Sequence, residues 1–205
     1  MARRVVCISR TLGAGGEEVA HDVAARLGFR HIDDEIVALA AQKAGVSQEQ
    51  MEKQEHSQPL VTRILESLAS APVVTEGGFV APAAPRQALP PSHLIEHVIR
   101  ETAEAGDVVI VAHGASHPLA GRDDVLRVLV TASPAVRARR LAKEQGLDDD
   151  AARKAVEASD RERAKYLERF YSVREEQPTQ YDITINTDGV PVPTAVSLVV
   201  AAAGA

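Results

Sequence analysis

Residues 5–20 read VVCISRTLGAGGEEVA, and this stretch decides the fold. Its first residues, Val5 to Ile8, are apolar and mostly β-branched, which is typical of a strand buried on both faces of a parallel sheet. A glycine-rich turn follows at 13–16. Apolar residues then recur at helical spacing as far as Leu27, and Gly28 is the expected C-cap. The stretch therefore predicts a strand, a tight turn and a helix.

The turn lies between a strand and a helix N-terminus, which is a favourable place for an anion. Backbone N–H groups converge there, the helix dipole favours negative charge, and glycine lets phosphate approach the backbone. The nucleotide-binding pattern G-x-x-x-x-G-K-[ST] is incomplete, however. With Gly15 as its second glycine, Arg10 stands at the first glycine position, Gly16 at the lysine position and Glu17 at the hydroxyl position. From spacing alone, a phosphate site and a plain packing turn are about equally favoured.

Arg10 shifts the balance toward the phosphate site. It ends the first expected strand, and open α/β sheets bind ligands at the carboxyl ends of their strands, so its guanidinium could supply the missing cation. Glu17 and Glu18 complement the helix dipole but would repel a nearby phosphate. They could instead hold Mg²⁺, which binds carboxylates and phosphates together.

Beyond this unit, strands and helices alternate along the chain. Strands are expected at 29–32, 107–112, 125–130 and 181–187. Helices are expected around 36–40, 46–70, 92–105, 134–143, 148–174 and 193–203, with a mobile loop at 72–91 that holds five of the eleven prolines. Such alternation predicts an α/β three-layer sandwich with a central, mostly parallel sheet of about five strands.

Composition narrows the class further. A chain of 205 residues can bury a sizeable core as one domain, and its single cysteine excludes a disulfide framework. A net charge of −6 and only 3% aromatic residues argue against nucleic acid as a partner. The apolar runs near the two ends are too short for a secretory signal or a membrane span. We therefore expect a cytoplasmic protein without membrane contact.

Several segments, in the correct order, resemble the cytidylate kinase-like family, a branch of the P-loop nucleoside monophosphate kinases. The similar segments are 8–10 with 13–20, 31–37, 125–140, 160–166 and 181–187, so that little beyond 72–91 is left out. The resemblance implies one P-loop-type domain over residues 1–205. Within it, an acceptor region is expected around 33–91 and a helical lid around 145–175.

The resemblance implies ATP-dependent phosphorylation of a nucleoside monophosphate, cytidylate by analogy, with Mg²⁺. Donor phosphates would lie on Gly13, Ala14, Gly15, Gly16, Glu17 and Glu18, near Arg10, with Arg137 and Arg140 approaching the donor or the lid. The acceptor would face Asp33, His113 and Gly114. Arg163, with Arg161 as its substitute, would clamp the transferring phosphoryl group.

Such a reaction needs no proton-abstracting residue, because phosphoryl transfer depends on positioning and charge neutralisation. Alanine at position 10 or 163 is therefore expected to weaken phosphate binding or turnover without unfolding the protein. Two positions depart from the pattern of cytidylate kinases: Gly16 replaces a lysine that this branch of the family commonly lacks, and His113 replaces the arginine of a Gly-Arg-Gly segment. The alternative function is a nucleotide-binding regulatory or interaction protein that keeps the fold without catalysis. A homodimer is compatible with either function.

Three further patterns have competing interpretations. His93-Leu-Ile-Glu96-His97 matches the zinc-peptidase pattern H-x-x-E-H, but a core-facing helix beside a proline loop is favoured, and no metal ligand set is predicted. His113 and His117 suit an acceptor loop and a plain surface equally well. The arginines of 137–143 and 161–174 alone indicate a solvated helix face, whereas the family resemblance predicts that a subset points inward. Cys7 is expected to be a small buried hydrophobe.

Overall fold

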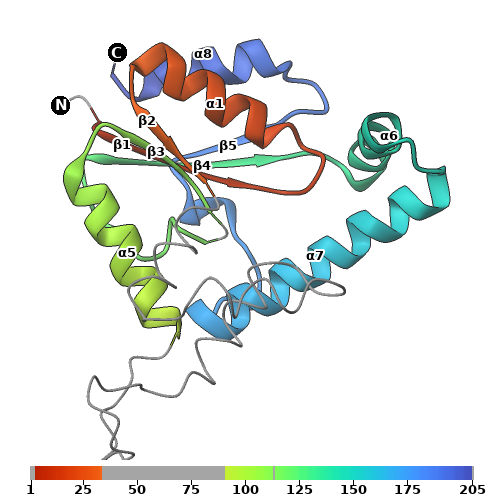
Figure 1. Ribbon diagram of the computed structural model, residues 1–205, viewed down its shortest axis with the longest axis horizontal. Coiled ribbons are helices and arrows are strands. Elements are labelled where there is room, and N and C mark those ends of the chain that lie inside the picture. The colour runs from red at the N-terminus through yellow and green to blue at the C-terminus, as the bar shows by residue number, and fades with distance from the viewer. Residues whose placement is uncertain (1–2, 34–90, 113, 205) are drawn as a thin grey trace, which may run out of the picture. The chain divides into compact units, whose positions relative to one another are not determined.

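The computed structural model describes residues 3–33, 91–112 and 114–204 (Figure 1). The chain forms two compact units, residues 1–33 with 99–205 and residues 34–98, and the first unit is described below. The expected helices at 36–40 and 46–70, nearly all of the loop at 72–91 and the expected role of His113 lie outside the described residues.

Five parallel strands form the sheet of the first unit, as the alternating sequence predicted. They are β1 (Val5–Arg10), β2 (Arg30–Ile32), β3 (Val108–Val111), β4 (Val125–Thr131) and β5 (Ile183–Asn186), in the order β2-β3-β1-β4-β5. In the central register, Ile8 of β1 lies beside Val111 of β3 and Val128 of β4. The first four side chains of β1 are fully buried, which explains the unbroken apolar run there. Cys7 is one of them, so the expectation of a buried cysteine is confirmed.

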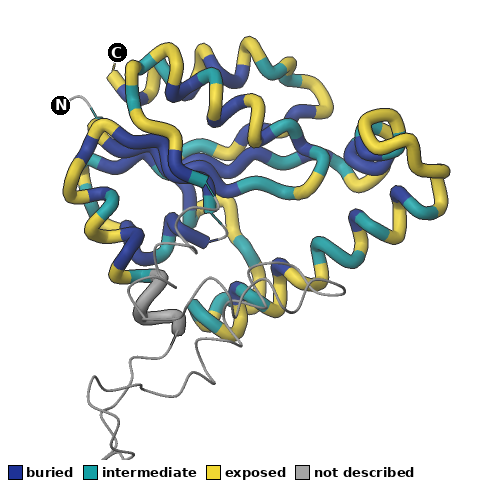
Figure 2. Tube along the Cα trace, in the orientation of Figure 1, coloured by how far each residue is buried: buried dark blue, intermediate teal, exposed yellow. Residues whose placement is uncertain are grey.

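Helices cover both faces of the sheet. They are α1 (Gly16–Leu27), α5 (Pro91–Ala105), of which residues 99–105 belong to this unit, α6 (Pro134–Gln145), α7 (Asp149–Tyr171) and α8 (Val192–Ala202). A short 3-10 helix η1 (Pro178–Gln180) precedes β5. Figure 1 shows α1 and α8 side by side on one face and α7 on the other, with α6 packed against α7. In Figure 2 the inner strands β1, β3 and β4 are mostly buried, whereas α7 is buried only at intervals along one face. The outer strands β2 and β5 each bury one residue. The expected three-layer arrangement is confirmed.

Apolar spacing explains which faces of α1 and α8 are buried. Val19 and Val23 of α1 belong to the same apolar cluster as Val196 and Val199 of α8, and all four side chains are fully buried. The helix α1 ends as predicted, because Gly28 adopts the left-handed conformation at its C-cap. Among the described residues, no helix has the length and apolar character needed to cross a bilayer.

The connections reverse direction between β1 and β4. The chain leaves β1 toward β2 on one side of the sheet, and leaves β4 toward β5 on the other side. In open α/β sheets, such a reversal opens a crevice at the carboxyl ends of the strands, where ligands bind. Arg10, which pairs with Val130 of β4, and the glycine turn that follows it lie at this position. The fold therefore places the turn where a ligand is expected.

Candidate phosphate-binding site

The turn between β1 and α1 depends on glycine conformations. Gly13 and Gly15 have φ angles of 75° and 76°, in the left-handed region, where a residue with a side chain would be strained. Gly15 caps α1, and its carbonyl accepts the first helical hydrogen bond, from the Val19 amide at 3.1 Å. The amides of the first turn, from Gly16 onward, have no intrahelical acceptor by the geometry of a helix start. The turn therefore offers backbone donors at the crevice.

The carbonyl oxygens of this turn accept hydrogen bonds from side chains that lie more than 120 residues further along the chain. Arg137 Nη1 donates to the Leu12 oxygen and Arg140 Nη1 to the Gly13 oxygen, each at 3.4 Å. Thr187 Oγ1 donates to the Ala14 oxygen at 2.9 Å. Three consecutive carbonyls are thus engaged by donors. A turn whose carbonyls are already bound presents less negative charge to an anion.

Arg137 of α6 is almost fully buried, with 3% of its surface exposed. Besides the Leu12 carbonyl, it binds the Ala132 carbonyl through Nε at 3.0 Å and the Asp160 carboxylate with both terminal nitrogens, at 2.9 and 2.6 Å. A Cβ at Gly13 would lie 2.8 Å from the Arg137 carbonyl oxygen. The helix α6 therefore packs directly on the turn, which leaves no room for a side chain at Gly13.

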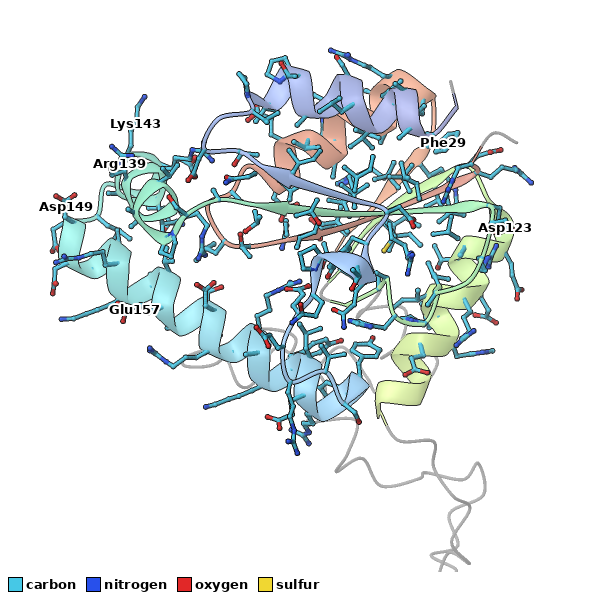
Figure 3. All side chains as sticks on the ribbon, turned by 180° about the vertical axis from the view of Figure 1, so that it is seen from behind. Phe29, Asp123, Arg139, Lys143, Asp149 and Glu157 are labelled. Atoms are coloured by element: carbon cyan, nitrogen blue, oxygen red, sulfur yellow. The ribbon has the colours of Figure 1, made fainter. Side chains whose placement is uncertain are left out.

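Arg140 lies one helical turn further along α6 and is fixed at the end of β5. Its Nη1 and Nη2 bind the side-chain and backbone oxygens of Thr187 at 2.9 and 2.7 Å. By contrast, Figure 3 shows Arg139 and Lys143 of the same helix pointing out to solvent. The predicted inward-pointing subset of arginines is therefore present.

Arg10 extends from the end of β1 across Gly16. Its Nη2 forms an ion pair with Glu17 and lies 3.8 Å from an oxygen of Asp33. The Arg10 side chain is 22% exposed, so this charge group is at the surface of the crevice and not inside the core. Two carboxylates and one guanidinium therefore meet at the start of α1. Carboxylate oxygens are ligands that Mg²⁺ prefers, so the chemistry of this donor set fits a magnesium–phosphate complex.

Arg163 of α7 reaches the same strand end from the opposite side and is 7% exposed. It donates to Ser9 Oγ at 2.8 Å, to the Arg10 carbonyl at 3.1 Å, and to the two oxygens of Glu176 at 2.5 and 3.0 Å. Tyr181 Oη also donates to Glu176. This group of residues links α7, the residues that flank η1 and the end of β1 through one buried ion pair.

Titration behaviour follows from that pair. Burial acts to raise the pKa of Glu176, but the hydrogen bonds and charge of Arg163 outweigh it and lower the pKa overall. Burial, followed by the charge of Glu176, raises the pKa of Tyr181 to about 12. Near neutral pH, Glu176 is therefore a carboxylate, and Tyr181 is a neutral donor to it.

A cavity of about 210 Å³ opens beside these arginines. Its lining includes Thr11 after β1, Arg137 of α6, and Asp160 and Arg163 of α7. Arg174 and Glu176 also line it, so three guanidinium groups and two carboxylates lie on its wall. It is large enough for several water molecules or a phosphoryl-sized group, since water takes about 30 Å³ in the liquid.

Not every residue predicted for the site is brought there. The Arg161 side chain is 65% exposed and lies 3.8 Å from Glu157 on its own helix, so it does not join Arg163. Glu18 is exposed on α1. Asp33 does reach Arg10. Gly114 is buried, and a Cβ on it would lie 2.7 Å from the Tyr171 ring.

The histidine patterns have separate outcomes. His117 is half-buried and stacks on Tyr171, with ring centroids 4.9 Å apart, so the plain-surface alternative is wrong for this residue. Burial lowers its pKa. His97 is exposed. Within 3–33, 91–112 and 114–204, no cluster of three His, Cys, Asp or Glu side chains could hold a metal ion.

Five participating residues were missed by sequence reasoning: Ser9, Asp160, Glu176, Tyr181 and Thr187. Ser9, Tyr181 and Thr187 stand in segments that resemble the family, and Ser9 is next to Arg10, which was assigned a role. Glu176 follows a highly charged run, and no local pattern distinguishes it from its neighbours. A buried ion-pair partner can be identified only once the fold brings it to its arginine.

Comparison with solved structures shows the fold of this chain. An uncharacterized protein from Eubacterium ventriosum superposes over 99% of both chains, with a TM-score of 0.68 and 16% identity. The shikimate kinase of Bacteroides thetaiotaomicron superposes over 98% of both chains, with a TM-score of 0.51 and 16% identity. Together with the parallel sheet and glycine turn, these likenesses define the fold as that of the P-loop kinases.

The sequence then identifies the family. Residues 5–189 match the cytidylate kinase-like family, and the chain belongs to it. The cytidylate kinases of Methanoculleus marisnigri and Methanopyrus kandleri are both 30% identical, over 89 and 96 residues. That of Halobacterium salinarum is 28% identical over 93 residues. The matched segments cover 43–45% of this chain and about half the length of each relative.

Proposed function

We propose that this protein transfers the γ-phosphoryl group of ATP to a nucleoside monophosphate, with cytidylate as the preferred acceptor. The observation that carries the proposal is the glycine turn at the crevice between β1 and β4, whose three carbonyls are bound by side chains. Arginines at the end of β1 supply the positive charge that a polyphosphate needs beside such a turn.

Each part of the site has a role in this proposal. The amides that begin at Gly16 bind donor phosphate oxygens, because they lie at a helix start. Arg137 and Arg140 hold the turn in shape through its carbonyls. Arg163 stabilises charge on the transferring group once its carboxylate partner yields. Mg²⁺, when bound with ATP, neutralises phosphate charge, and Glu17 or Asp33 would hold it.

Cytidylate as acceptor is supported by the family and by the names of three relatives, each matched over about half its length. The test is a coupled assay with ATP, Mg²⁺ and each of CMP, dCMP, UMP, AMP and GMP, with shikimate as a control acceptor. We expect turnover with CMP or dCMP to exceed that with the other acceptors. Turnover with shikimate alone would reject the proposal.

One observation favours a second candidate, a nucleotide-binding regulatory protein without turnover. Arg163 makes four hydrogen bonds to Ser9, Arg10 and Glu176, so its guanidinium is engaged within the protein. Calorimetric titration with a non-hydrolysable ATP analogue separates the candidates when it is run beside the assay. Tight binding without turnover on any monophosphate would favour the regulatory protein.

A further inference from the structure

The side chain of Arg10 occupies the space beside Gly16 that a P-loop lysine would need. A Cβ built on Gly16 would lie 2.5 Å from Arg10 Cβ, 3.1 Å from its Cδ and 3.4 Å from its Cγ. Non-bonded carbon atoms separate by about 3.5–4.0 Å at best, so the first of these distances is a collision. Since the Cβ of a strand residue is fixed by the backbone, Arg10 cannot avoid it by changing rotamer. Any side chain at position 16 is therefore incompatible with any side chain at position 10.

This collision gives a steric reason for the nucleotide-binding pattern itself. In G-x-x-x-x-G-K-[ST], the position of Arg10 is glycine and the position of Gly16 is lysine. This chain has the two residues exchanged: the glycine is on the helix and the cation is on the strand. In both arrangements, one of the two positions lacks a Cβ, and the other carries a positive charge.

We propose that Arg10 is the phosphate-binding cation of this protein and takes the place of the P-loop lysine, and that Gly16 is required to let its side chain cross the start of α1. The inference rests on the proposed function insofar as the bound anion is a nucleotide polyphosphate. Arg10 already holds a carboxylate there, because its Nη2 pairs with Glu17, the residue at the next position of the helix. A phosphate oxygen that displaces Glu17 finds a guanidinium in place, beside the amides of the first turn.

The exchange changes the chemistry of the site. A guanidinium is planar, remains charged at any accessible pH and can give two parallel N–H bonds, whereas a lysine ammonium is a compact point charge on a flexible stem. The cation also comes from a buried strand, so its root is fixed by the β1–β4 register, in which Arg10 lies beside Val130. Arg10 therefore serves as a pre-positioned fork for two phosphate oxygens.

The first test removes the cation. We expect Arg10→Ala to weaken binding of a non-hydrolysable ATP analogue with Mg²⁺ by about 10- to 100-fold, the range that loss of a charged hydrogen bond gives. Arg153→Ala is the matched control, because Arg153 is 65% exposed on α7 and pairs only locally, with Asp150. Binding by Arg10→Ala within threefold of the control would overturn the inference.

The second test restores the usual pattern. We expect R10G/G16K to bind the analogue at least tenfold more tightly than Arg10→Gly, because the lysine gains both room and a role. R10A/G16K carries the same lysine but keeps the Cβ at position 10 that collides with it. It should therefore not recover analogue binding, and it should melt at a lower temperature than R10G/G16K. Equal binding and equal melting temperatures for the two double variants would overturn the steric exchange.

A third pair of variants needs no lysine. Gly16→Ala adds only a Cβ and is expected to weaken analogue binding by displacing Arg10. Gly189→Ala adds a Cβ into open space and should not. If Gly16→Ala binds the analogue as tightly as Gly189→Ala, Gly16 is not needed for Arg10, and the inference fails.

These measurements separate the inference from the proposed function. Absence of turnover on every monophosphate, with analogue binding that still depends on Arg10, would reject the kinase and keep the exchanged cation. Undiminished CMP phosphorylation by Arg10→Ala would keep the kinase and reject the exchange. A wild-type protein that does not bind the analogue would overturn both.

Discussion

Two pairs of arginines meet the glycine turn from opposite sides, and they differ in what holds them. On the α6 side, Arg137 and Arg140 bind carbonyl oxygens of the turn and of neighbouring backbone. At the end of β1, the charges of Arg10 and Arg163 are matched by carboxylates. We refer to them as the carbonyl-bound pair and the carboxylate-bound pair.

This difference separates the arginines that hold the turn in shape from those that offer positive charge to a ligand. A carbonyl that accepts a bond from arginine is part of the backbone, so the carbonyl-bound pair cannot let go without distorting the turn. A carboxylate can be replaced by a phosphate, which offers the same kind of oxygen. The carboxylate-bound pair is therefore suited to exchange its partners for a ligand. Arg137 and Arg163 belong to both kinds in part, because Arg137 also pairs with Asp160 and Arg163 also donates to the Arg10 carbonyl.

The largest expected effect tests whether the carboxylate-bound pair is only a ligand site. Arg163→Ala would leave the Glu176 carboxylate largely buried without its cation, since that side chain is 17% exposed. Breaking such a pair from one side typically costs about 3–5 kcal/mol, so we expect the free energy of unfolding in urea to fall by that amount. The sequence alone predicted that this substitution spares the fold, and the burial of the ion pair changes that expectation.

Arg161→Ala is the control on the same helix. Its side chain is 65% exposed and pairs with Glu157 one turn away, and such pairs contribute roughly 0.5 kcal/mol or less. Similar losses of stability for Arg163→Ala and Arg161→Ala would show that Glu176 finds another partner or water. Arg163 of the carboxylate-bound pair would then contribute no more to the stability of the fold than an exposed arginine does.

The next effect concerns the packing of α6 on the turn. Gly13→Ala meets two penalties: a left-handed φ of 75° and a Cβ 2.8 Å from the Arg137 carbonyl oxygen. Together they should lower the free energy of unfolding by about 2–4 kcal/mol. Gly28→Ala has a similar φ of 67° but open space around its Cβ, so it should lose only about 1 kcal/mol. Denaturant unfolding of both variants measures the cost of the contact between position 13 and α6. Equal losses of unfolding free energy would mean that α6 moves away from the new Cβ at no cost.

A smaller effect concerns how the stability of the fold depends on pH on the acidic side. The pKa of Glu176 is lowered in the folded protein by Arg163, against the effect of burial, so this carboxylate stabilises the fold above its unfolded pKa near 4.5. That stability is lost as pH falls through the lowered value. We expect Glu176→Gln to be less stable than wild type by about 1.5–3 kcal/mol at pH 7. The difference should shrink below pH 4.5, because protonated Glu176 resembles the glutamine.

The exposed Glu157→Gln serves as the comparison for this pH series, since Glu157 is 64% exposed. Its difference from wild type should stay small at every pH. A gap between Glu176→Gln and wild type that is constant from pH 7 to pH 3 would contradict a lowered pKa in the folded state.

Much of the fold could be predicted from the sequence because local patterns decide it. The continuous apolar runs at 5–8 and 108–111 are typical of strands covered on both faces, and Ser133-Pro134 marks the start of α6 as observed. The end of the chain shows the limit of such patterns. Alternation predicted a strand over 181–187, but β5 covers only Ile183–Asn186, because Tyr181 is still bound to the preceding 3-10 turn.

The candidate site was less predictable, because its partners come from distant parts of the sequence. Arg10 and the glycines could be named, since strand, turn and helix follow one another. Glu176 could not be named as the partner of Arg163, because that pair exists only after α7 folds over the end of β1. Likewise, no sequence pattern shows that Arg137 is buried whereas Arg139, two residues away, is exposed.

The smallest stability effect tests the carbonyl-bound side directly. Thr187 is 3% exposed, and its hydroxyl donates to the Ala14 carbonyl and accepts from Arg140 at 2.9 Å each. Thr187→Val keeps the shape but leaves both groups without that partner, so we expect a loss of about 1–2 kcal/mol in unfolding free energy. Thr184→Val in β5, the strand that Thr187 follows, is the control, because Thr184 is exposed. If the hydroxyl also helps to shape the turn for phosphate, Thr187→Val should bind the ATP analogue more weakly and Thr184→Val should not. Equal stability and equal binding for the two valines would show that the turn keeps its form without Thr187, and that α6 alone holds it.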